Sequence, residues 1–289
     1  MAISTTTAKE LTQEQVATIL TQPLETASKF LAAVPASNIY DTPGPLRVPS
    51  LPESAADALP WTGENEQIPE QDYDFGELAL LPSSMKSVKV ITRFSSELGR
   101  QAVVSIDAAL QQRLVSDVAG RLDAQFLSAS GDGVTTPKGL FAQTGTQSVK
   151  VTGPLTVDYV LEAQGLALAA NVNPDGLAFF VRPEDFMAIR GQKDADGRYL
   201  VQPDVQAGGL VSPVLGAQVF VSPRVPKGKA ALVDMTKVVV ARDVAPSVKL
   251  LDQTYAEFDQ LALRTVTRMD AGVTASKAVI TFSGIGATA

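Results

Sequence analysis

The chain has 289 residues, 45% of them hydrophobic and 19% charged, and a net charge of −7 at pH 7. This apolar content is sufficient for a hydrophobic core and excludes wholesale disorder. The absence of cysteine and histidine excludes disulfides, thiolate zinc sites and catalysis by either residue type within the chain, and the acidic balance argues against a broad basic surface for nucleic acid.

Residues 1–50 have the pattern of an arm. Apolar residues with helical spacing predict a helix from Gln13 to about Val34. Prolines at positions 43, 45, 49 and 52 then forbid helix and predict an extended run. Such a segment has little to pack against locally, so we expect something outside the chain to hold it.

Residues 51–85 form a second extended excursion, which is strongly acidic. No lysine or arginine lies between Arg47 and Lys86, and clustered carboxylates repel one another and gain nothing in a core. Aromatic residues nevertheless stand among them, which predicts a long β-hairpin with one apolar side. Trp61 could fold back onto its own domain or, as we favour, contact another subunit. The carboxylates are Glu53, Asp57, Glu64, Glu66, Glu70, Asp72, Asp74 and Glu77.

A strand and the strongest helical pattern of the chain come next. Residues 86–101 alternate as a strand, and apolar residues then recur every four positions over about 105–129. At ~1.5 Å per residue, this helix of about 24 residues is about 36 Å long. The sequence GDG at 131–133 is typical of a helix stop, with a phosphate-binding loop as the weaker alternative. The ridge consists of Ile106, Leu110, Leu114, Val118, Leu122 and Phe126.

From about residue 150 helices and strands alternate. Asp194 to Gly197 reads as a plain turn, because the oxygen ligands of a calcium loop do not continue after it. Helices are expected at 157–170 and from Pro183, and strands at 177–181, 214–222, 229–235 and 237–243, with two more in 261–282.

Several short motifs, taken in chain order, resemble the major capsid proteins of tailed bacteriophages with the HK97 fold. They are Trp61-Thr62-Gly63-Glu64, Gly131-Asp132-Gly133, Pro137-Lys138-Gly139-Leu140, Arg182-Pro183-Glu184-Asp185, Asp196-Gly197-Arg198-Tyr199-Leu200, Leu215-Gly216, Val233-Asp234 and Arg268-Met269-Asp270. Each motif alone is weak, and their order carries the resemblance.

The resemblance implies an α+β fold with named parts. These are an N-terminal arm (1–50), an extended E-loop (51–87), a P domain (88–145) with a spine helix at about 105–129, an A domain (146–236), returning P-domain strands (237–270), and a C-terminal segment packing with the A domain (271–289). It also implies contacts between subunits through the E-loop residues Trp61, Gly63, Glu64, Tyr73 and Phe75.

The implied function is structural, with no catalysis, cofactor or metal. Copies of the chain would assemble as hexamers and pentamers into an icosahedral head, formed in the host cytoplasm, that encloses double-stranded DNA without reading its sequence. The implied partners are other copies and a portal, with either a separate scaffolding protein or none; decoration proteins are an open question, and no membrane is involved. An encapsulin-type nanocompartment and a hydrolase using paired carboxylates remain as alternatives.

Two features of some relatives are not expected here. Certain family members join subunits by an isopeptide bond from an E-loop lysine, and this chain has no lysine between Lys29 and Lys86. Others carry a long fused N-terminal scaffold that is cleaved off. Because this lysine is absent, no covalent cross-link is expected. Only about 40–50 residues precede the excursion here, so no large maturation cleavage is expected.

Overall fold

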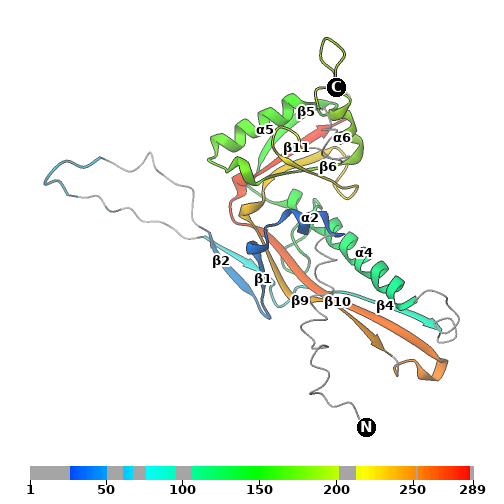
Figure 1. Ribbon diagram of the computed structural model, residues 1–289. Coiled ribbons are helices and arrows are strands. Elements are labelled where there is room, and N and C mark those ends of the chain that lie inside the picture. Colours follow the sequence, from blue (N-terminus) through cyan, green and yellow to red (C-terminus); the bar gives the residue numbers. More distant parts are fainter. Residues whose placement is uncertain are drawn as a thin grey trace, which may run out of the picture.

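The computed structural model describes residues 27–50, 61–67, 70, 76–95, 106–201, 213–251 and 253–286 (Figure 1). The side chains of residues 106–111, 175, 244–248 and 256 lie outside the described part. Helices and strands form two bodies, one around a four-stranded sheet and one around a five-stranded sheet.

The four-stranded sheet has the order β1-β9-β10-β4. Its strands are β1 (Ile39–Asp41), β4 (Val88–Ser95), β9 (Val238–Leu251) and β10 (Gln260–Val273). β10 pairs antiparallel with both β9 and β4, and β1 pairs parallel with β9. The strand expected at 237–243 is longer than predicted, because β9 keeps pairing with β10 as far as Leu251.

The long helix α4 (Ile106–Phe126) packs on this sheet. It confirms the predicted helix, which ends three residues earlier than expected. Four members of the predicted ridge have buried side chains, namely Leu114, Val118, Leu122 and Phe126, whereas the side chains of Ile106 and Leu110 lie outside the described part.

The helix is followed by a tight loop that contains the GDG sequence. The Asp132 carboxylate accepts hydrogen bonds from the backbone N–H groups of Val134, Thr135 and Thr136, at 2.9 to 3.1 Å. These donors lower the pKa of the Asp132 carboxyl well below its usual range. GDG therefore lies in a self-contained loop after the helix end, as predicted.

The five-stranded sheet has the order β5-β11-β8-β6-β7, so the C-terminal strand β11 lies between β5 and β8. β6 is buried along its whole length, as its apolar sequence predicts. The elements are β5 (Gln147–Gly153), α5 (Val157–Ala169), β6 (Leu177–Val181), α6 (Pro183–Arg190), β7 (Gln218–Val221), β8 (Lys229–Asp234) and β11 (Val279–Ile285).

Smaller elements lie between these strands and helices. The strand expected at 214–222 begins only at Gln218, because Val214 and Ala217 bridge each other across a turn. The turn expected at Asp194 is confirmed, since the Asp194 carbonyl accepts from the N–H of Gly197 at 3.1 Å. Single-turn 3-10 helices are η2 (Ala36–Asn38), η4 (Leu140–Ala142), η5 (Pro174–Gly176), η6 (Met235–Lys237), η7 (Ala256–Phe258) and η8 (Ser276–Ala278).

The N-terminal region corrects two predictions. The helix predicted to run unbroken to Val34 is interrupted at Ser28, whose backbone is extended (φ −82°, ψ 121°) and which caps the short helix α2 (Lys29–Ala33). Residues 13–26 of that predicted helix lie outside the described residues. The expectation that the arm cannot bury its apolar residues locally is also wrong for residues 28–41, because Phe30, Leu31 and Val34 are buried in the chain's own core.

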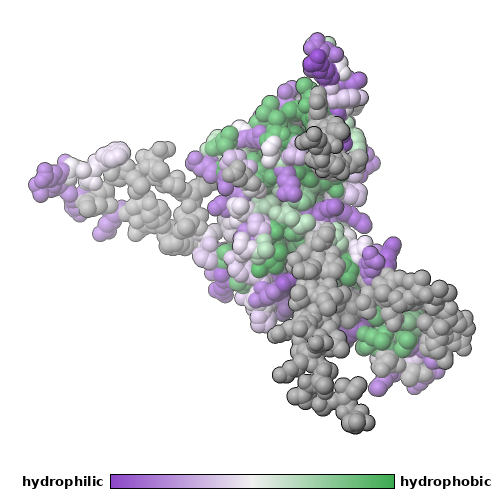
Figure 2. All heavy atoms as spheres, viewed as in Figure 1, coloured by the Kyte–Doolittle hydropathy of each residue, from purple (hydrophilic) through white to green (hydrophobic). Residues whose placement is uncertain are grey.

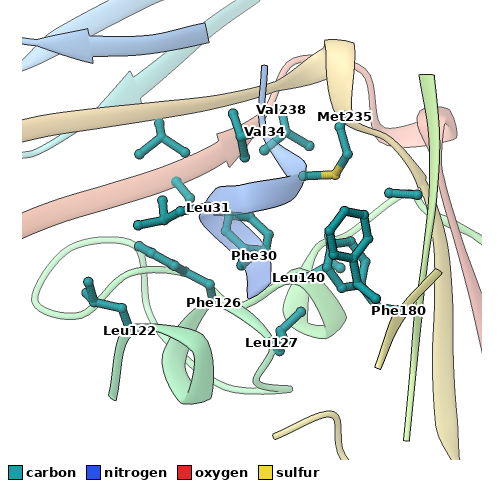
Figure 3. Packing of buried hydrophobic residues seen from close by; sticks show 14 of the residues in the cluster. Phe30, Leu31, Val34, Leu122, Phe126, Leu127, Leu140, Phe180, Met235 and Val238 are labelled. Atoms are coloured by element: carbon teal, nitrogen blue, oxygen red, sulfur yellow. The ribbon is translucent and has the colours of Figure 1, made fainter. Parts of the chain in front are cut away.

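Figure 3 shows how α2 fits into that core. The Phe30 ring lies 5.0 Å from the ring of Phe126 on α4 and 6.0 Å from the ring of Phe180 on β6, measured between centroids. The segment therefore links the helix of one body to the sheet of the other. β1, which follows η2, then joins the four-stranded sheet.

Candidate assembly surfaces

A projecting segment stands on a two-stranded base. Strands β2 (Leu46–Ser50) and β3 (Gly76–Leu80) pair antiparallel. Most of the chain between them lies outside the described residues, so the long β-hairpin expected there stays a prediction. Residues 61–67, the described part of its far end, lie well away from both bodies (Figure 1). We call residues 51–75 the acidic segment.

The far end of the acidic segment is an exposed turn. The Gly63 N–H donates to a carboxylate oxygen of Glu66 at 3.0 Å, and the Glu66 N–H donates to the Gly63 carbonyl at 3.4 Å. Trp61 is fully exposed, so it does not fold back onto its own domain. Glu64 is exposed as well, and Figure 2 shows this end of the molecule as largely hydrophilic. Tyr73 and Phe75 lie outside the described residues.

The base of the projection is fixed to the four-stranded sheet by Arg268 of β10. Its guanidinium donates to the carbonyls of Pro82 at 2.7 Å and Met85 at 3.1 Å, and to the Asp243 carboxylate at 2.7 Å. Both partners in the Arg268–Asp243 salt bridge are largely buried. One side chain thus holds the chain just after β3 against the sheet.

Asp270, two residues further along β10, makes a second attachment. Its buried carboxylate accepts the Leu81 N–H at 3.0 Å and the Ala271 N–H at 2.9 Å. Burial outweighs these bonds and raises the pKa of the Asp270 carboxyl. Gly272 permits the close approach of β3, because a Cβ there would lie 2.8 Å from a methyl group of Leu80. The base of the projection is therefore attached to the four-stranded sheet by both Arg268 and Asp270.

The N-terminal segment has its own buried attachment. The Asp123 carboxylate of α4 accepts the Ser28 hydroxyl at 2.6 Å and the backbone N–H groups of Lys29 at 2.9 Å and Phe30 at 3.1 Å. The Ser28 hydroxyl oxygen in turn accepts the Leu31 N–H at 3.1 Å. Asp123 thus completes the capping of α2 from another element, and we call this arrangement the Ser28–Asp123 clasp.

Sequence reasoning missed the clasp and the Arg268 attachment. A signal for the first was present, since Asp123 directly follows the ridge residue Leu122 and a carboxylate so near the buried side of a helix needs a partner. Arg268 was noticed only as part of a motif. Their partners lie 95 and 183 residues away in sequence, so the contacts cannot be read from local pattern.

A third surface lies on the five-stranded body. Leu161 and Leu168 are about half exposed, and their spacing of seven residues puts them on one side of α5. Leu215, also exposed, is tied to the same helix because its carbonyl accepts from the Gln164 side chain at 2.8 Å. This apolar strip is a further candidate for contact with another chain.

The carboxylates do not form a catalytic pair where the structure describes them. The Glu66 carboxylate is bound to its own turn, and Glu64 is exposed; Asp72 and Asp74 lie outside the described residues. In the described ranges no group of three or more acidic residues is placed to hold a metal ion. No helix in those ranges is long and apolar enough to span a membrane.

Comparison with known proteins identifies a family that matches most of the chain. A model described as the phage capsid family matches residues 12–284. The major capsid protein of Halomonas phage phiHAP-1 is 29% identical over 119 residues, covering 41% of this chain and 19% of that relative. The chain thus matches only a small part of that protein's length.

Solved structures share the fold. A chain of Mycobacterium phage Cain matches with a TM-score of 0.69 and 19% identity over 100% of both chains. The capsid of a native GTA particle matches with a TM-score of 0.68 and 17% identity over 90% of each. A virus-like particle from Pyrococcus furiosus matches with a TM-score of 0.61 and 10% identity over 93% of this chain and 98% of that one. Identities this low carry over the fold alone.

Proposed function

The chain belongs to the phage capsid family, and from that premise we propose that it is the subunit of an icosahedral head built from hexamers and pentamers around double-stranded DNA. Its α+β fold is shared with phage capsid structures, and the family is a structural one. The observation that carries the proposal is Trp61, fully exposed at the far end of a projection whose base is hydrogen-bonded to the four-stranded sheet.

The physical argument is one of burial. A large aromatic side chain held in water loses the ~1.5–3 kcal/mol that burial of a large apolar side chain supplies. In a shell, the same side chain can be buried on a neighbouring copy, where aromatic residues contribute most to association. Trp61, Gly63, Glu64, Tyr73 and Phe75 are therefore proposed as contact residues of an E-loop.

The two bodies fit the proposed domain roles. The four-stranded sheet with α4 corresponds to a P domain and its spine helix, and the five-stranded sheet with α5 and α6 corresponds to an A domain. Residues 271–289 would belong with the latter through β11, which pairs with β5 and β8. The proposed N-terminal arm is shorter than residues 1–50, since residues 28–41 are built into the body.

We further propose that the shell binds DNA weakly and that its subunits are not covalently cross-linked. Each chain has a net charge of −7. The shell would therefore enclose DNA without binding it tightly, because phosphate binding depends on neutralising cations. No cross-link is expected from the acidic segment, which contains no lysine. Mature particles boiled in denaturant should then give one band near the chain mass of 30.4 kDa, whereas covalent ladders would contradict this.

The main test is Trp61→Ala in expressed particles. Because Trp61 is fully exposed in the single chain, the substitution should leave the folding of the unassembled subunit unchanged. Assembled particles should lose resistance to heat or denaturant, by ~2 kcal/mol or more per contact. Variant particles that assemble and resist heat like the unaltered ones would remove Trp61 as an anchor.

The structural likeness to the Pyrococcus furiosus particle favours an encapsulin-type compartment as the second candidate function. The contents of purified particles distinguish it from a phage head. Genome-length DNA in particles from an infected host supports the phage head. Protein cargo without DNA would support the compartment. A separate scaffolding protein and a portal are further partners expected in the first case.

A further inference from the structure

A cavity of about 450 Å³ lies between α4 and the four-stranded sheet. Its walls are formed by residues 86–90, which lead into β4, by one side of α4, by residues 136 and 137 in the loop after that helix, and by β10. Sites for small molecules in proteins measure ~300–1,000 Å³. The cavity is therefore large enough to hold a small molecule.

Hydrogen bonds hold the walls of the cavity in place. The Lys86 N–H donates to the Thr135 carbonyl at 3.0 Å, which joins the chain before β4 to the loop after α4. The side-chain amide of Gln125 donates to the Pro137 carbonyl at 2.8 Å, which joins α4 to the same loop. A ligand would not have to order these segments, and a site that is already formed binds at lower cost.

The interior of the cavity is largely apolar. Leu122 of α4 and Met269 of β10 line it and are buried. Val88 and Val90 of β4 also line it, and because they lie two residues apart on a strand they point to the same side. Such a lining favours a hydrocarbon or aromatic group, since the transfer of apolar surface out of water is favourable.

Three cations also line the cavity, namely Lys86, Lys89 and Arg121, and all three are exposed. Lys89, which alternates with Val88 and Val90, reaches the cavity because β4 is the edge strand of its sheet. Within the described ranges none of the three forms a salt bridge, and the cavity lining there includes no acidic residue. An anion would therefore meet three cations without a competing carboxylate.

We propose that this cavity binds an amphiphilic organic anion, meaning a small molecule with an apolar body and a single anionic group. The body lies against buried Leu122 and Met269, and the anionic group stays near the exposed cations Lys86, Lys89 and Arg121. This inference goes beyond the proposed function, because such binding does not depend on assembly of the chain. Duplex DNA fits the site less well, since its phosphates could contact the cations but would leave the apolar interior empty.

Three probes separate the two parts of such a ligand. Decanoate has an apolar chain and a charge, decanol has the same chain without the charge, and acetate has the charge without the chain. Calorimetric titration of unassembled full-length subunits should give a Kd for decanoate below ~1 mM. Decanol should bind at least about tenfold more weakly, because it lacks the charge that the cations attract. Acetate should bind at least about a hundredfold more weakly, because it has no apolar chain to bury.

A substitution that fills the cavity tests its location. Val90 is 38% exposed on an edge strand, so Val90→Trp should leave the fold intact while its larger side chain occupies the space of the ligand. Decanoate binding should weaken at least about tenfold. Val134→Trp is the matched control, since Val134 is exposed and does not line the cavity; it should change the affinity less than about twofold.

Charge reversal tests the cations. Lys86→Glu with Arg121→Glu should weaken decanoate binding at least about tenfold, because like charges then meet. The matched control is Lys150→Glu with Lys227→Glu, which makes the same change in net charge at two exposed positions of the five-stranded body and should leave the affinity within about twofold. Circular dichroism checks that each variant is folded.

Several outcomes would overturn the proposal. Equal affinity for decanoate and decanol would remove the role of the cations, and a Kd for decanoate above ~1 mM would leave no site of this kind. Decanoate binding that persists in folded Val90→Trp would place the ligand elsewhere on the chain. Binding to free subunits that is lost in assembled particles would assign the cavity to a segment of a neighbouring copy instead.

Discussion

Removing the Asp123 carboxylate should release the N-terminal segment from the body. In Asp123→Ala, the Ser28 hydroxyl and the N–H groups of Lys29 and Phe30 lose their acceptor. Each bond to a buried charged acceptor contributes ~1.5–3 kcal/mol, and an unpaired buried donor adds to the loss. Part of this is recovered because the freed N–H groups can reach water once the segment opens, so we expect a net cost of ~3–5 kcal/mol.

Limited trypsin digestion measures this opening directly. The peptide bond after Lys29 is protected because α2 is docked and Phe30 is buried. When cleavage requires transient opening, its rate follows the population of the open form. A cost of ~3 kcal/mol therefore raises the rate of cleavage after Lys29 about a hundredfold or more, since ~1.4 kcal/mol is a factor of ten.

Two further variants sharpen the test. Asp117→Ala is a matched control on the same helix, because Asp117 is exposed and forms its salt bridge with Arg113 one helical turn away; it should change the rate less than about threefold. Ser28→Ala should have an intermediate effect, and combining it with Asp123→Ala should add less than the sum. A cleavage rate for Asp123→Ala within about threefold of the unaltered chain would refute the clasp.

Three more predictions concern stability, each measured by denaturant unfolding of subunits. Gly131→Ala should cost ~2 kcal/mol or more, because the residue has φ +115° and a Cβ would lie 2.1 Å from the Pro137 carbonyl oxygen; an effect below ~0.5 kcal/mol would contradict this. Arg268→Met should cost ~3–5 kcal/mol, since it leaves the largely buried Asp243 without the Arg268 guanidinium, and an unchanged midpoint would show that the attachment is not needed. The raised pKa of Asp270 means that the folded state holds its proton longer than the unfolded state, so this carboxyl lowers stability as pH rises from its ordinary value of 3.8 through the raised one. Asp270→Asn should therefore gain stability relative to the unaltered chain as the pH rises above about 4, and a stability difference that does not vary with pH would contradict this prediction.

Local sequence pattern was a sound guide wherever burial repeats along one element. The four-residue spacing from Leu114 to Phe126 predicted α4 and its buried side, and the apolar run of β6 predicted a fully buried strand. The pattern failed at Ser28, where the helical spacing of apolar residues continues although the backbone is extended and interrupts the helix. The Asp123 carboxylate, 95 residues from Ser28 in sequence, accepts the N–H groups of Lys29 and Phe30. Local periodicity cannot predict a partner so far away in sequence.

The sequence by itself determined the order of elements, the family resemblance, and an acidic excursion with a lone tryptophan. Only the tertiary structure decided that residues 28–41 pack into the chain's own core and four-stranded sheet. It also decided that Arg268 fixes the base of the projection to that sheet. The exposed cations Lys89, Arg93, Lys249 and Arg264 are the clearest case. They come from three strands and from positions 89 to 264 of an acidic chain, so composition hides them. The register of β4, β10 and β9 brings them onto one face, because side chains of paired residues point the same way.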